Sequence, residues 1–199
     1  MSLDVPPPTL DVPDGWRLVS EELTTPFDVR VVTVTANTRI YEDVALRERL
    51  ADVTDTAATW RFVFASRLRI RPANPPSRAL SALVTDRANS RFVDVLAERG
   101  FESIDRADTR RFDLGAGQDA PARASGDSGR PTTEATRYRA SVRFDDRSVP
   151  VEAYFAAWAG GDGEFLLGGG AYPLTVPDSE SFDPEAARED LFSMLRSIR

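Results

Sequence analysis

Apolar and polar side chains alternate over residues 59–72, TWRFVFASRLRIRP, and strict alternation is typical of a β-strand with one buried face. One face of this predicted strand carries Trp60, Phe62, Phe64, Leu68 and Ile70, and the other carries Arg61, Arg67, Arg69 and Arg71. Residues 136–144 repeat the pattern, with Arg137, Arg139 and Arg143 opposite Tyr138, Ala140, Val142 and Phe144. The two stretches therefore predict strands whose apolar faces reach the core and whose arginines share the opposite face.

Further strands are predicted where β-branched and aromatic residues cluster between turn-forming residues. They cover residues 16–20, 27–37, 101–106, 109–114, 149–158 and 164–174. The short sequences DDRS and GGDG separate the last three strands of the chain and are typical of hairpin turns.

Apolar residues spaced three to four apart predict three helices, over residues 42–53, 77–99 and 183–198. The second helix follows prolines and precedes Gly100, and we expect it to break near Asn89. Asp183 and Pro184 suit the N-cap and the first turn of the third helix.

Two segments contain little that could anchor them in a core. Residues 115–135 are rich in Gly, Ala, Pro and Ser and lack large apolar side chains, which predicts a long flexible loop. Residues 1–15 are proline-rich and acidic, which predicts an extended arm. The remaining elements, over residues 16–199, predict a single α+β domain with a central antiparallel sheet and flanking helices.

This order of elements resembles the PsbP-like fold, in which helices flank a central antiparallel sheet. The chain is also similar to uncharacterised haloarchaeal proteins in which an aromatic strand runs into an Asn-Pro step and a long helix. Here these features are residues 60–70, Asn74-Pro75 and the helix from Ser77. Neither resemblance brings a catalytic motif, and the lipobox cysteine often found in such families is absent.

The charge composition indicates the kind of organism the chain comes from and says little about its function. The chain has 32 acidic and 25 basic residues, all the latter arginine, and a formal net charge of -7. An acidic chain without lysine is typical of organisms that accumulate salt, because hydrated carboxylates keep proteins soluble there. The N-terminal residues lack a signal-peptide pattern and no apolar run is long enough to cross a bilayer, so a cytoplasmic protein is predicted. An extracytoplasmic location would require an export segment outside this sequence.

The absence of His, Cys and Lys excludes several chemistries. No histidine base, thiolate nucleophile, Schiff-base lysine or zinc site is available, so no catalytic residue, cofactor or metal ligand is predicted. LLGGGAYP, residues 166–173, lacks the spacing of a phosphate-binding loop, and its glycines are expected to make room for a crossing helix or an aromatic ring. Acidic stretches lack the EF-hand spacing.

The candidate site is therefore the pair of arginine rows. It comprises Arg67, Arg69, Arg71, Arg137, Arg139 and Arg143. If the two strands are neighbours, these guanidinium groups meet and attract either an anionic ligand or nearby carboxylates such as Glu152 and Glu164. Glu152 and Glu164 could also meet each other as a pair of acids. Nucleic acid is excluded as a partner because the net charge is negative.

The sequence favours a non-enzymatic binding or interaction module for a protein or a small anionic ligand. The alternative is a hydrolase or lyase that uses carboxylates and arginines, with or without a divalent cation. The identity of the partner and the oligomeric state stay open.

Overall fold

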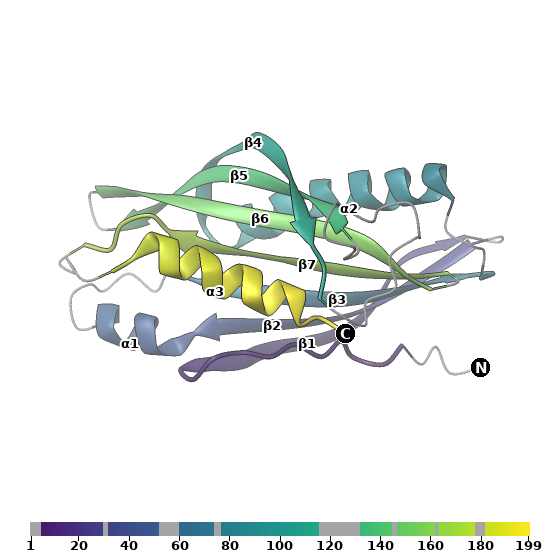
Figure 1. The fold of residues 1–199 in the computed structure, drawn as a ribbon, viewed down its shortest axis with the longest axis horizontal. Coiled ribbons are helices and arrows are strands. Elements are labelled where there is room, and N and C mark those ends of the chain that lie inside the picture. The colour runs from purple at the N-terminus through teal and green to yellow at the C-terminus, as the bar shows by residue number, and fades with distance from the viewer. Residues whose placement is uncertain are drawn as a thin grey trace.

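A computed structural model describes residues 5–29, 32–51, 60–73, 77–115, 132–144, 147–161, 163–177 and 182–199. In these parts of the chain, seven antiparallel strands form one sheet in the order β1-β2-β3-β7-β6-β5-β4 (Figure 1). The strands are β1 (Trp16–Val29), β2 (Val32–Asp43), β3 (Phe62–Arg71), β4 (Phe101–Asp113), β5 (Thr132–Phe144), β6 (Arg147–Gly161) and β7 (Glu164–Pro173). The helices are α1 (Val44–Ala51), α2 (Arg78–Glu98) and α3 (Pro184–Arg196).

Two hydrophobic layers hold α2 and α3 on opposite faces of the sheet. Phe92 and Leu96 of α2 share a core cluster with Phe62 and Phe155. Leu191 and Leu195 of α3 share another cluster with the intervening residues of the same strands, which point to the other face. Because successive strand side chains alternate, β3 and β6, which flank the central strand β7, contribute to both layers.

The helix ends follow the expected local chemistry. The Ser77 hydroxyl accepts a hydrogen bond from the Leu80 backbone N–H at 3.1 Å and caps α2. Asp183 Oδ1 accepts from the backbone N–H groups of Glu185 and Ala186 and caps α3, with Pro184 in its first turn. The predicted cap and first turn of α3 are therefore confirmed.

The predicted α+β class is wrong, because the sheet dominates the molecule. Strands hold 54% of the described residues and helices 26%, and the helices are only three. The prediction gave too little length to β1, for which only residues 16–20 and the start of 27–37 were expected. The hydrogen-bonded sheet extends through polar stretches that have little strand signal of their own, such as residues 20–24 of β1. The antiparallel sheet itself was correctly predicted.

Three local predictions also fail. Residues 27–37 were expected to form one strand, but they contain the end of β1 and the start of β2. Residues 101–114 were expected to form two strands, but β4 is one strand with two register shifts. The expected break at Asn89 does not occur, because its side chain donates to the Thr85 carbonyl and accepts from the Tyr138 hydroxyl, both at 2.8 Å.

The two segments predicted to be loosely held differ in the structure. Within the predicted loop over residues 115–135, residues 132–135 belong to β5, and residues 116–131 lie outside the described residues. The N-terminal arm lies against the sheet from residue 5 onward, with Val5 and Leu10 buried. Thr9 and Arg199 exchange backbone hydrogen bonds of 2.8 and 3.0 Å, so the two ends of the chain are paired.

Candidate functional site

Both arginine rows lie on the face of the sheet that α3 covers. Phe62 of β3 and Tyr138 of β5 belong to the core cluster under α2. The odd-numbered residues of these strands, which include all six arginines, therefore point to the opposite face. However, β7 and β6 lie between β3 and β5. The six guanidinium groups therefore form two separate rows instead of one cluster, and each row must be considered with its own neighbours.

The row on β5 is largely neutralised by carboxylates. Arg137 forms ion pairs with Asp108 at 2.6 Å and with Glu152 at 3.0 Å. Arg143 lies 3.5 Å from Glu102 in an exposed pair. Arg139 is exposed and makes no ion pair within the described parts of the chain.

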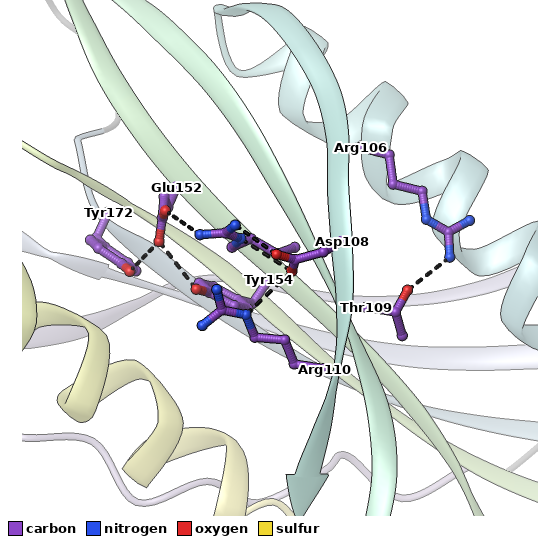
Figure 2. A network of polar contacts seen from close by, with 8 residues as sticks. Arg106, Asp108, Thr109, Arg110, Glu152, Tyr154 and Tyr172 are labelled. Carbon is purple, nitrogen blue, oxygen red and sulfur yellow. Dashed lines mark hydrogen bonds and ion pairs between the residues drawn. The ribbon is translucent and has the colours of Figure 1, made fainter.

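Glu152 is the centre of a network that joins β4, β5, β6 and β7 (Figure 2). Its Oε1 accepts from Arg137 Nη1, and its Oε2 accepts from the hydroxyls of Tyr154 at 3.1 Å and Tyr172 at 2.9 Å. The two tyrosine rings are stacked with centroids 6.4 Å apart. Register brings these groups together, because Arg137 lies opposite Tyr154 and Glu152 lies opposite Tyr172.

The electrostatics of the network favour neutral tyrosines. Burial raises the pKa of Tyr172, and its hydrogen bond to Glu152 raises that pKa further. Burial also raises the pKa of Tyr154, and the negative charge of Glu152 adds to this effect. Both hydroxyls therefore remain hydrogen-bond donors near neutral pH, and both carboxylate oxygens of Glu152 are occupied within the protein.

In the row on β3, two arginines pair with a carboxylate of β7 and the third has no ion pair in the described part of the structure. Arg67 and Arg69 share Glu164 at 3.5 and 2.7 Å. Arg71 is partly exposed and makes no ion pair in the described part of the structure. Two arginines thus share one carboxylate, and a third adds its charge beside them.

An open depression of about 550 Å³ lies at the C-terminal end of β3. Its lining residues are Arg69, Ile70, Arg71, Pro72, Ala73 and Glu164. Of the six arginines predicted from the sequence, Arg69 and Arg71 line it, while Arg137, Arg139 and Arg143 belong to a strand on the far side of β7 and β6.

Gly163 lets the turn before β7 approach the end of β3 next to this depression. The Ile70 backbone N–H donates to the Gly163 carbonyl at 2.7 Å. Gly163 has a φ of 69°, and a Cβ atom there would lie 2.9 Å from the Ile70 carbonyl oxygen. A larger residue would push the turn away from β3.

The two acids considered as a pair do not meet. Glu152 lies opposite Tyr172 and Glu164 lies opposite Arg69, at distant positions along β7. Each binds arginine instead, which is the ion-pairing alternative. Sequence reasoning missed Asp108, Tyr154 and Tyr172, because only the register across four strands brings them to Glu152.

The glycine-rich segment of β7 is a contact surface for α3. A Cβ atom at Gly168 would lie 2.5 Å from Ile198 and 2.9 Å from Leu195, and one at Gly170 would lie 2.8 Å from Leu191. The glycines make room for a crossing helix, as predicted from the sequence, and have no sign of a phosphate-binding loop.

Arg61 anchors α3 to the sheet from the same face. Its guanidinium donates to Asp43 at 3.1 Å, to Asp190 at 2.9 Å and to the Ala187 carbonyl at 3.1 Å. It also lies 5.1 Å from the centroid of the Trp16 ring. This buried arginine joins β1, β2, β3 and α3, and its role is structural.

The profile of a family described as a domain of unknown function, DUF6517, matches residues 2–199. The chain belongs to the DUF6517 family. No curated protein and no solved structure matches it, so the PsbP-like resemblance and the haloarchaeal origin stay predictions for this DUF6517 chain. Within its described residues, no helix is long and apolar enough to cross a membrane.

Proposed function

We propose that this DUF6517 protein is a non-enzymatic binding module for a small anionic ligand, which binds in the depression at the end of β3. The observation that carries the proposal is Arg71, which borders the depression and makes no ion pair within the described residues. A guanidinium in this setting offers a planar set of donors that suits carboxylate or phosphate oxygens.

The contrast between the two rows supports this location. Arg137 is held between Asp108 and Glu152, so a ligand there would have to displace two carboxylates. At β3, Arg67 and Arg69 share Glu164, and Arg71 borders the depression without an ion pair among the described residues. A ligand can approach Arg71 there without displacing a carboxylate of the described residues, and the positive charge of Arg71 attracts an anion.

The competing hypothesis, a carboxylate-based hydrolase or lyase, has less support. Such an enzyme needs two acids that face a substrate across a cleft. Asp108 and Glu152 lie on either side of Arg137, but both bind it, and Glu152 also accepts from two tyrosines. Each carboxylate already accepts hydrogen bonds from side chains of the protein.

The proposal is tested by thermal unfolding of the full chain with and without phosphate or citrate, at constant ionic strength. The anion should raise the unfolding temperature of the parent protein, and Arg71→Gln should remove that response. Arg139→Gln is the matched control, since Arg139 is also an exposed strand arginine without an ion pair in the described residues. No response to either anion in the parent protein would refute the proposal.

We also propose that the chain is adapted to high salt, as its resemblance to haloarchaeal proteins implies. Its formal net charge of -7 and its arginine-only basic residues support this proposal. Unfolding measured in rising concentrations of KCl tests it.

A further inference from the structure

We infer that two copies of this chain form a dimer in which β1 of one copy pairs antiparallel with β1 of the other, so that the sheet continues across the two copies. The inference concerns an edge of the sheet and does not depend on the anion proposed to bind at β3. Three observations support it: exposed apolar side chains on β1, a differently built opposite edge and a charge pattern on β1 that complements itself.

Apolar side chains are exposed along β1, which is one of the two edge strands of the sheet (Figure 1). Four large apolar side chains are well exposed among the described residues, and three of them belong to β1. They are Leu18, Val19 and Leu23, which are 46%, 43% and 55% exposed. An edge strand has backbone N–H and C=O groups without a strand partner on its outer side, and apolar side chains beside them favour pairing with another strand.

The opposite edge, β4, has features that prevent such pairing. Seven of its 13 residues are charged, and Ser103 has a φ of 52°. Two register shifts also interrupt its pairing with β5. Charges and bulges of this kind keep an edge from adding another strand. Register shifts occur on β1 as well, but residues 20–24 between them pair with β2 without interruption.

Two opposite charges on one face of β1 have no ion-pair partner among the described residues. Arg17 and Glu22 lie opposite even-numbered residues of β2, so their side chains share a face of the sheet. Glu42, which lies opposite Arg17, already pairs with Arg47 at 3.1 Å and with Arg99 at 3.0 Å. A strand with one such charge of each sign complements a second, antiparallel copy of itself.

One antiparallel register pairs these charges between the two copies. It places Ser20 opposite Ser20 of the second copy, on the two-fold axis of the dimer. Val19 is the extra residue of the register shift between Leu18 and Ser20, so it occupies no position in the pairing. Arg17 of each copy therefore lies opposite Glu22 of the other, and the dimer gains two ion pairs across its interface.

The same register brings the exposed leucines together on the other face of the sheet. Leu18 and Leu23 both lie opposite odd-numbered residues of β2 and so share that face. Each Leu18 is directly opposite Glu21 of the second copy, whose carboxylate already pairs with Arg39 at 2.9 Å. Each Leu18 is also diagonal to Leu23 of the second copy, within reach of a leucine side chain. The four leucines lose exposed apolar surface in the dimer, which stabilises it.

The first test is sedimentation equilibrium of the full chain at one fixed salt concentration. The parent protein should reach twice the mass of one chain as its concentration rises, and Leu23→Lys should weaken dimerisation by about tenfold or more. Leu83→Lys is the matched control, because Leu83 of α2 is 56% exposed but lies away from β1 in the sequence and on a helix. A parent protein with the mass of one chain at every concentration overturns the inference, as does an equal effect of the two substitutions.

The second test uses charge reversal and is insensitive to misfolding of a single variant. Arg17→Glu and Glu22→Arg should each weaken dimerisation by about tenfold or more, because each places like charges opposite one another in the proposed register. An equimolar mixture of the two variants should dimerise again, since every pair across the interface then has opposite charges. Dimerisation of either variant as tight as that of the parent protein, or no recovery on mixing, overturns the inference.

Discussion

At the scale of single residues, arginines on the same face of one sheet have different surroundings. Arg137 lies between two carboxylates and its side chain is 14% exposed, whereas Arg71 borders an open depression without an ion pair in the described residues. The difference comes from the strands beside them. Glu152 lies on β6 next to β5, whereas Glu164, which lines the same depression as Arg71, is shared by Arg67 and Arg69.

Glu152→Gln tests whether the β5 network is a stabilising element. Three donors surround this position, from Arg137, Tyr154 and Tyr172. The glutamine amide has only one acceptor oxygen, and its NH₂ group would face donors instead of acceptors. Because Arg137 and Glu152 are mostly buried, we expect the free energy of unfolding to fall by about 2–4 kcal/mol. Denaturant unfolding followed by circular dichroism measures this change.

The matched control for that experiment is Glu98→Gln. Glu98 pairs with Arg91 at 2.7 Å, but both side chains are about 60% exposed to solvent, which screens the interaction. The control should leave the unfolding midpoint unchanged within error. Equal effects of the two substitutions would show that the Glu152 network contributes no more than a surface ion pair.

At the scale of elements, the close packing of α3 on β7 restricts which residues fit at their contact. Gly168 and Gly170 of β7 face Leu191, Leu195 and Ile198, and Asp183 fixes where the helix begins. The helix can approach the sheet closely because these positions lack side chains. Arg61 then fixes the helix from the sheet side through Asp190 and the Ala187 carbonyl.

Gly170→Ala tests this close approach. The added Cβ would overlap the Phe62 carbonyl and lie 2.8 Å from Leu191 Cδ1, so the strand or the helix must move. Overpacking of this kind is expected to lower the free energy of unfolding by about 1–3 kcal/mol. Chemical denaturation of the variant and the parent protein gives the difference.

Gly160→Ala is the control for Gly170→Ala on the neighbouring strand. Its Cβ would lie 3.5 Å from Leu166 Cγ, an ordinary van der Waals distance. We expect no loss of stability, and a gain of up to about 1 kcal/mol from the reduced flexibility of the unfolded chain. A stability of Gly170→Ala no lower than that of this control would contradict the proposed helix contact.

At the scale of the whole molecule, charge is unevenly neutralised. The chain has a formal net charge of -7, and several described ion pairs, such as Arg199 with Asp11 and Arg91 with Glu98, are well exposed. Exposed pairs contribute little individually, whereas repulsion among excess carboxylates acts across the whole surface. Salt therefore changes stability mainly by screening that repulsion.

We expect the temperature of unfolding to rise as KCl increases from about 0.05 M to about 3 M, because the Debye length falls to a few ångströms over this range. Differential scanning calorimetry at several salt concentrations measures the change. A constant or falling unfolding temperature would contradict the proposed adaptation to salt. The full chain should be used, since Thr9 and Arg199 join its two ends through backbone hydrogen bonds.

The local pattern of the sequence determined which side chains share a face. Alternation alone placed Arg67, Arg69 and Arg71 opposite Phe62 and Phe64, because the side chains of a strand point to alternate faces wherever the strand lies. It also indicated the cap of α3 and the role of the β7 glycines, which depend on neighbours in sequence or on the need for space beside a large group.

Only the tertiary structure decided which arginine meets which carboxylate. Strand order places β7 and β6 between the two arginine rows, and register brings Asp108, Arg137, Glu152 and Tyr172 together across four strands. The extent of β1 was also underestimated and β4 was divided in two, because an edge strand is held by hydrogen bonds to its neighbour even where its side chains are polar or its register shifts. Such pairings join residues far apart in the chain, so no local pattern of side chains specifies them.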